Sequence, residues 1–353
     1  MVSAARSNNF DSLRLIGAVL VLYGHSYALT GATPPAFAAN GVHTLGVKIF
    51  FVISGYLIAQ SWLRDRDLFR FLLRRCLRIF PALAMVVFLT ICVLGPIFTT
   101  LPLADYFNSS RTFFYLWNIG LYVNYALPGV FEQNVYPGAV NGSLWSLPAE
   151  FLMYLITPLL LSRLVNRHKS TFLAIVAGIV VAGLLAQALP LDPQLTVYGT
   201  SISAILQTAP YFLIGSAFAL YRLERFANIY VAFVGLLALG VFATSGLVKE
   251  AMLLLILPYA CVAFGLGYAP VFRQITKGND LSYGIFLYAF PVQQALSATL
   301  GPQIGPWGNF IAPLAICIGL AYLSWNLIER PTLGLKPVRR DAQPAAVPGL
   351  AGS

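Results

Sequence analysis

Long apolar runs, separated by short polar and often basic segments, make up most of this chain. A helix needs about 20 mostly apolar residues to cross the hydrocarbon core of a bilayer. The pattern predicts ten such spans, at residues 12–29, 43–62, 77–98, 144–162, 171–189, 199–221, 227–245, 250–268, 281–300 and 308–328. The predicted fold class is therefore all-α, a polytopic transmembrane helix bundle of about ten spans.

The composition agrees with a membrane protein. Of the 353 residues, 58% are hydrophobic and only 10% are charged, whereas a soluble domain carries about 25% charged residues. The four cysteines lie in or beside apolar runs, with neither a C-x-x-C pair nor a histidine at metal-ligand spacing. The composition therefore excludes a soluble protein, and we expect no metal site.

The net charge of +10 indicates how the chain is oriented in the membrane. With ten spans both termini lie on one side of the membrane, and 19 of the 22 basic residues then share that side. Because basic loops stay in the cytoplasm, we expect both termini to be cytoplasmic. Basic residues scattered among apolar runs cannot form a continuous phosphate-binding face, so we expect no nucleic-acid partner.

Two segments lie outside the predicted bilayer. We expect residues 1–330 to form the transmembrane domain and residues 331–353, rich in proline, alanine and glycine, to form a disordered cytoplasmic tail. The outer segment 99–143 is rich in aromatic residues. An interfacial belt is the favoured interpretation of these residues, and a sugar-stacking surface is the alternative.

Three ionisable residues lie at membrane depth: His25, Lys48 and Glu150. Charged groups inside spans are costly and mark function or an ion pair. Counted from the outer ends of their spans, all three lie roughly 6–9 Å below the boundary, at 1.5 Å per residue. Each also has a structural interpretation: His25 as a hydrogen-bonded interior residue, Lys48 as a side chain that snorkels to the interface, and Glu150 as a partner of Lys48.

Arginines cluster at the cytoplasmic side. Arg14 and His25 lie on one face of the first helix, roughly 16 Å apart along its axis. Arg74, Arg75 and Arg78 are spaced to align on a second helix. Arginine forks bind phosphates bidentately, and attraction to lipid headgroups is the alternative.

Several motifs, in order, resemble the acyltransferase 3 family of integral membrane O-acyltransferases. The motifs are Asp11-Ser12-Leu13-Arg14 with His25; Phe50-Phe51-Val52-Ile53-Ser54-Gly55-Tyr56-Leu57; Arg74-Arg75-Cys76-Leu77-Arg78-Ile79-Phe80-Pro81; Ser143-Leu144-Trp145-Ser146-Leu147-Pro148-Ala149-Glu150 with Tyr154; and Glu329-Arg330-Pro331. One motif departs from the family, because Ala289 stands where many members have histidine. His25 is then the only histidine inside a predicted span, and His43 lies at an outer loop edge.

The resemblance implies an O-acyltransferase that takes an acyl group, usually acetyl, from cytoplasmic acyl-CoA and passes it to an outward-facing glycan or lipid-linked glycan. It further implies a bacterial inner membrane, with no permanently bound cofactor. Arg14, Arg74, Arg75 and Arg78 would hold the acetyl-CoA donor. The sequence does not give the oligomeric state.

A sugar hydroxyl needs a general base, and the usual pKa of histidine suits that task. His25 is therefore the expected catalytic residue, either as base or as acyl carrier, with Glu150 orienting it or holding the acceptor. Residues expected to bind the substrate or its oxyanion are Lys48, Ser54, Trp145, Ser146 and Tyr154. A transporter or flippase of a lipid-linked saccharide is the alternative function, but no inverted repeat supports it.

Overall fold

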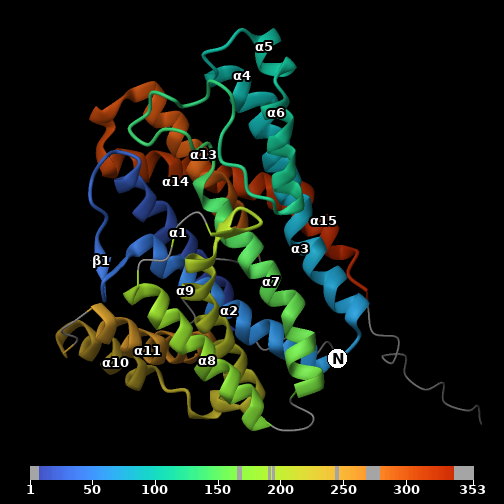
Figure 1. Ribbon diagram of the computed structural model, residues 1–353, viewed down its shortest axis with the longest axis vertical. Coiled ribbons are helices and arrows are strands. Elements are labelled where there is room, and N and C mark those ends of the chain that lie inside the picture. Colours follow the sequence, from blue (N-terminus) through green and yellow to red (C-terminus); the bar gives the residue numbers. More distant parts are fainter. Residues whose placement is uncertain are drawn as a thin grey trace, which may run out of the picture.

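The computed structural model describes residues 8–164, 169–189, 192, 195–242, 246–267 and 279–337. Its described helices include α1 (Phe10–Ala28), α2 (Val42–Arg64), α3 (Leu68–Leu89), α7 (Ser146–Leu159), α8 (Lys169–Ala188), α9 (Ile202–Tyr221), α10 (Ile229–Phe242), α11 (Gly246–Leu266), α13 (Ser282–Leu300) and α14 (Gly305–Ser324). A helix thus occupies each of the ten predicted segments, which confirms the helical fold class (Figure 1). The predicted disordered tail, residues 331–353, begins in the short helix α15 (Arg330–Gly334), so its first residues are ordered, and the part after residue 337 lies outside the described residues.

Shorter elements connect or extend these helices. They are β1 (Ala36–Phe37) and β2 (Asn40–Gly41), the π-turn η1 (Thr90–Leu94), α4 (Gly95–Phe98), α5 (Leu103–Asn108), α6 (Ser110–Phe114), the 3₁₀ turns η2 (Tyr115–Gly120) and η3 (Gly142–Trp145), the π-turn η4 (Leu160–Leu164), β3 (Thr196–Val197), β4 (Thr200–Ser201), the 3₁₀ turns η5 (Leu223–Phe226) and η6 (Pro302–Ile304), the π-turn η7 (Trp325–Glu329) and α15 (Arg330–Gly334). Two antiparallel hairpins, β1 with β2 and β3 with β4, are the sheets of the described chain.

Seven of the described helical segments are long and apolar enough to cross a membrane. The other three predicted spans correspond to α1, α10 and α13: α10 has only 14 residues, while α1 and α13 carry polar side chains that lower their apolar content. Large apolar side chains on α8, α10 and α14 point out of the bundle, as expected for a surface that faces lipid. The protein is therefore an integral membrane protein, and the number of spans stays a prediction.

The third span begins earlier than its apolar run predicts. Its helix runs from Leu68 to Phe98, through the π-turn η1, instead of from residue 77. The first turns of α3 carry four arginines, which an apolar window excludes. The cap at the start of α3 is Asp67, whose side chain accepts a hydrogen bond from the backbone N–H of Arg70.

The bundle has two distinct ends. Arg14, Arg74, Arg75 and Arg78 define the arginine end, and the segment 99–141 lies at the far end. Figure 1 places α4, α5 and α6 at the end of α3 opposite to its first turns. Arg14, near the start of α1, places the first described residues at the arginine end. The described C-terminus lies at the same end, because Arg74 donates a hydrogen bond to the carbonyl of Pro337 over 3.5 Å.

Helix α2 is the centre of the bundle, because it packs against α1, α7, α9 and α11. Its approach to α9 is closest at two glycines: a Cβ on Gly55 would lie 1.9 Å from the carbonyl oxygen of Phe212, and one on Gly215 would lie 2.3 Å from that of Val52. Backbones can come this close in a membrane only where small residues remove the side chain. Tight helix contacts thus fix the position of the side chains that α2 carries.

A buried ion pair ties α2 to α11. Lys48 donates hydrogen bonds to Glu250 over 2.6 Å and to Asn40 over 2.7 Å. The same carboxylate accepts hydrogen bonds from Tyr211 over 2.8 Å and from Asn40 over 2.9 Å. Lys48 is 1% exposed and Glu250 3%. The partner of Lys48 is therefore Glu250, not Glu150, and the lysine is not an interfacial side chain.

Removal of one member of this pair should destabilise the protein. We expect Lys48→Met to cost about 3–5 kcal/mol, because it leaves the Glu250 carboxylate buried without a counter-charge. The double variant Lys48→Met/Glu250→Met should recover most of that loss. The measurement is the thermal unfolding midpoint in detergent, and Lys249→Met, a change at the residue next to Glu250, is the control. An unchanged unfolding midpoint in Lys48→Met would contradict the structural role.

Candidate functional site

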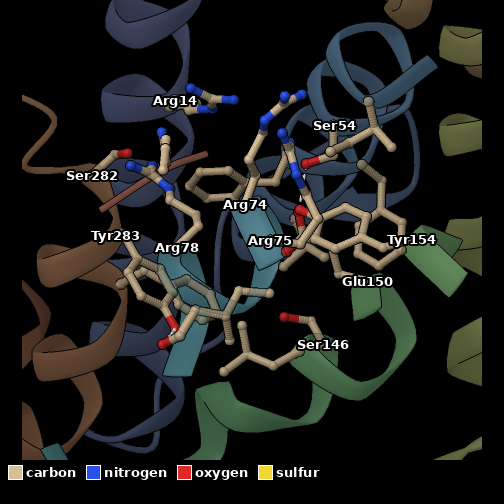
Figure 2. A pocket seen from close by; sticks show the side chains of 18 residues that line it. Arg14, Ser54, Arg74, Arg75, Arg78, Ser146, Glu150, Tyr154, Ser282 and Tyr283 are labelled. Atoms are coloured by element: carbon tan, nitrogen blue, oxygen red, sulfur yellow. Dashed lines mark hydrogen bonds between the residues drawn. The ribbon is translucent and has the colours of Figure 1, made fainter. Parts of the chain in front are cut away.

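A cavity of about 190 Å³ opens among α1, α2, α3, α7 and α13 at the arginine end of the bundle. Figure 2 shows the guanidinium groups that converge on it, with Ser54, Glu150 and Tyr154 beside Arg75. The cavity is lined by eight of the residues expected from the sequence, namely Arg14, Ser54, Arg74, Arg75, Arg78, Ser146, Glu150 and Tyr154. The sequence motifs therefore meet at one site although they come from four different helices.

Asp280 forms ion pairs with two of the arginines that line the cavity, Arg14 and Arg78. Its carboxylate accepts a hydrogen bond from Arg78 and lies 3.7 Å from the guanidinium of Arg14. Burial alone would raise the pKa of the Asp280 carboxyl, but the charges of Arg78 and Arg14 outweigh burial and hold this pKa well below its usual range. Asp280 therefore stays ionised and fixes both guanidiniums at the wall of the cavity.

Asp65 holds a third arginine in the same way. Arg74 lies 2.5 Å from one carboxylate oxygen of Asp65, and Arg70 lies 2.7 Å from the other. Hydrogen bonds from Arg70 and Arg74 hold the pKa of Asp65 well below its usual range. The loop between α2 and α3 thus anchors the start of the arginine row.

Arg75 differs from its neighbours because no described carboxylate pairs with it. One of its terminal nitrogens donates to the hydroxyl of Ser61 over 3.4 Å. Its Nε is buried and has no hydrogen-bond partner among the described residues. A guanidinium whose buried nitrogen has no described counter-charge can bind an anion, and Arg75 lines the cavity.

Lys336 adds a further cation to the cavity wall, from the segment after α15. Burial, together with the charges of Arg78, Arg75, Arg14 and Arg74, lowers the pKa of Lys336 to about 8. The motif-based expectation missed this residue. Its only signal in the sequence is its place in the basic stretch shortly after Glu329-Arg330-Pro331.

Glu150, on α7, lies beside Arg75 in the cavity (Figure 2), and two hydroxyls hold its carboxylate. Ser54 and Tyr154 each donate a hydrogen bond to the same carboxylate oxygen over 2.5 Å. Ser54 is six residues after Lys48 on α2, roughly 9 Å further along the helix. Glu150 therefore lies deeper than Lys48, and the predicted single layer of ionisable groups is divided. The three-residue cluster of Ser54, Glu150 and Tyr154 can hold or polarise a polar group that enters the cavity.

His25 lies outside the cavity, toward the far end of α1. Its ring contacts the ring of Phe290 edge to face at 5.2 Å and that of His43 at 5.6 Å. Its Nδ1 is buried and has no hydrogen-bond partner among the described residues. Phe286 lines the cavity one turn before Phe290 on α13. Aromatic side chains therefore lie between the arginines and the histidine, and Glu150 does not orient His25.

His43, which was predicted at an outer loop edge and without a role, lies next to His25. It lies in the first turn of α2, not in a loop, and its Nδ1 is also buried without a partner among the described residues. A Cβ on Gly24 would lie 2.6 Å from the backbone nitrogen of His43, so α1 and α2 are in close contact here. His25 lies near the end of α1 and His43 near the start of α2, on either side of the β1–β2 hairpin that joins the two helices. The similar depth of the two histidines in consecutive spans is the sequence signal that could have identified the pair.

Two other expected substrate-binding residues lie away from the cavity. Lys48 is enclosed in its ion pair with Glu250, and Trp145 is half-buried, with its backbone carbonyl accepting a hydrogen bond from Thr200 over 2.8 Å. Ser146, the next residue, does line the cavity. Within the described part of the chain, no group of three His, Cys, Asp or Glu side chains could hold a metal ion.

Several relatives of this chain are named as O-acetyltransferases, one of them as putative. It is 30% identical over 330 residues to an O-acetyl transferase of Shigella phage Sf6, a match that covers 92% of this chain and 96% of the relative. It is 28% identical to nodulation protein 10 of Rhizobium leguminosarum bv. viciae over 95% of both chains. It is 26% identical to the putative peptidoglycan O-acetyltransferase YrhL of Bacillus subtilis, over 83% of this chain and 51% of the relative.

The family comparison covers nearly the whole chain. The model of the acyltransferase domain matches residues 7–329, a range that includes every expected site residue. No solved structure matches the chain. The family match and the shared length with the phage enzyme show that the chain belongs to the acyltransferase 3 family and is an acyltransferase.

Proposed function

We propose that this enzyme moves an acetyl group from acetyl-CoA, bound in the arginine cavity, to a hydroxyl of a glycan or lipid-linked glycan at the far end of the bundle. The observation that supports this most strongly is the cavity itself. Arg75 lacks a described carboxylate partner, and Lys336 and three further arginines surround it. Such a site matches the phosphates of a coenzyme A thioester.

The charge distribution supports a cytoplasmic donor. The arginine end carries the basic loops of the chain, which the positive-inside rule assigns to the cytoplasm. In a bacterium the membrane would be the inner membrane, with acetyl-CoA inside and the glycan outside. A glycan acceptor is consistent with two relatives that are named as peptidoglycan O-acetyltransferases, one of them as putative.

The reaction needs a base where the acceptor enters. His25 lies on the same helix as Arg14, roughly 16 Å further toward the far end, and Phe50 and Phe286 line the cavity between them. The acyl-bearing arm of the donor would pass these rings. His25 takes the proton of the acceptor hydroxyl, the oxygen attacks the thioester carbonyl, and the tetrahedral intermediate releases the thiolate, which takes the proton from His25. In the alternative route His25 first carries the acetyl group as a covalent intermediate, and the same residues bind the donor.

Loss of His25 should abolish transfer. We expect purified His25→Ala to transfer radiolabelled acetyl from acetyl-CoA to glycan at least 100-fold more slowly than wild type, since a general base contributes about 10²–10⁴-fold. Trp307→Ala, a change at an exposed side chain outside the cavity, is the control and should keep wild-type rates. Full transfer by His25→Ala would refute its role, and movement of glycan across vesicles without acetylation would favour a transporter.

The donor affinity should depend on pH through Lys336. Its pKa of about 8 means that the side chain is charged below this pH and neutral above it. We therefore expect kcat/KM for acetyl-CoA to fall between pH 7 and pH 9, by roughly fivefold for the loss of one cation worth about 1 kcal/mol.

Two variants test the assignment of this pH dependence. In Lys336→Gln, kcat/KM for acetyl-CoA should be low and should not change between pH 7 and pH 9. In Lys336→Arg, kcat/KM should keep its high value to higher pH. Arg225→Gln, in the exposed turn η5, is the matched control for loss of a positive charge. A Lys336→Gln profile that still falls near pH 8 would show that another group is responsible.

A further inference from the structure

A second pocket, of about 680 Å³, lies at the far end of the bundle. Six of its lining side chains are Arg111, Phe114, Trp117, Tyr122, Asn124 and Glu132. Pockets that bind small molecules have volumes of about 300–1,000 Å³ and combine apolar walls with a few polar groups. The pocket has these properties, and none of its lining residues belongs to the arginine cavity.

The apolar wall is a set of exposed rings. Phe114, Trp117 and Tyr122 are 53%, 60% and 52% exposed. Trp117 and Tyr122 are 6.2 Å apart between ring centroids, and Tyr122 lies 5.9 Å from Tyr198, which extends the aromatic surface. Flat rings of this kind stack against the C–H faces of sugar rings, which are the apolar surfaces of a saccharide.

The polar wall carries both donors and acceptors. Arg111 pairs with no described carboxylate and can donate from its guanidinium. Glu132 accepts one hydrogen bond, from the backbone N–H of Gly129 over 3.1 Å, and its carboxylate has further lone pairs. Asn124 contributes an amide, which can both donate and accept. A guanidinium, a carboxylate and an amide together match several hydroxyls, whereas the carboxylate repels a lipid phosphate.

The walls are held in place by their own backbone. Asn118 is buried, its amide donates to the carbonyl of Asn124, and its oxygen accepts from the N–H of Asn124, both over 2.9 Å. The N–H of Tyr122 donates to the carbonyl of Trp117 over 3.0 Å. On the other side, the N–H of Thr100 donates to the carbonyl of Gly129 over 3.0 Å. A pocket that is already formed binds its ligand without an ordering cost.

The same segment reaches the surroundings of His25. Tyr125, next to Asn124, packs against the cluster of Leu29, Ala139 and Phe290. The N–H of Val140 donates to the carbonyl of Tyr125 over 2.7 Å. Because Phe290 contacts the ring of His25, one continuous layer joins the far-end pocket to the expected base.

We propose that the far-end pocket binds one or two sugar rings of the acceptor glycan, with Trp117 and Tyr122 stacking against them and Arg111, Asn124 and Glu132 binding their hydroxyls. This inference rests on the proposed function only in naming the sugar as the acceptor. The pocket would hold the glycan at the far end of the bundle, connected to His25 through Tyr125 and Phe290, while the donor occupies the opposite end.

Sugar binding can be measured without any acetyl transfer. The probes are trimers of N-acetylglucosamine and of glucose, and the signal is the fluorescence of Trp117, obtained as the difference between wild type and Trp117→Phe. We expect at least one trimer to quench this signal saturably, and Glu132→Ala to weaken the apparent Kd roughly tenfold. No saturable quenching by either trimer would overturn the inference. Quenching of Trp117 by brominated lipid as strong as that of Trp307, which is 59% exposed, would assign the rings to the bilayer interface instead.

Transfer kinetics separate this inference from the proposed function. We expect Trp117→Ala to raise the apparent KM for glycan roughly tenfold and to leave the KM for acetyl-CoA unchanged, while Trp307→Ala changes neither. An unchanged glycan KM in an active Trp117→Ala enzyme overturns the pocket assignment alone. Saturable trimer binding by a wild-type protein that transfers no acetyl group overturns the proposed function and leaves the sugar site standing.

Discussion

Every charge inside this bundle needs a partner, because an isolated ion in a medium of low dielectric is too costly to bury. Lys48 is neutralised by Glu250, Arg78 by Asp280, and Arg74 by Asp65. Arg75 has no such partner among the described residues, and it faces a cavity. The pairing pattern thus separates the cations that stabilise the fold from Arg75, which is available to bind an anionic ligand together with Lys336.

The position of the helices connects the two ends of the protein. Helix α1 carries Arg14 near one end and His25 near the other, and α13 carries Phe286 in the cavity and Phe290 against His25. Glycines bring α2 close to both α1 and α9, so these side chains are fixed with respect to one another. A donor held by arginines and an acceptor held at the far end could therefore meet at His25 within the bundle.

Much of the site could be predicted from the sequence. Arg14, Ser54, Arg78 and Glu150 belong to short motifs whose order is visible along the chain, and they do line one cavity. The ten helical segments follow from the apolar pattern alone. The early start of α3 could not be predicted that way, because its arginines interrupt the apolar run.

What the sequence could not give are pairings between distant residues. Lys48 and Glu250 are 202 positions apart, as are Arg78 and Asp280, and no local pattern joins them. The predicted depth of Glu150 relative to Lys48 was wrong, because this depth depends on how α7 lies against α2.

A structure of the enzyme with bound acetyl-CoA would show directly whether the donor occupies the arginine cavity. We predict its phosphates beside Arg75 and Lys336 and its acetyl end directed past Phe50 and Phe286 toward His25. A nucleotide bound elsewhere, or an acyl arm directed out of the bundle, would exclude the arginine cavity as the donor site.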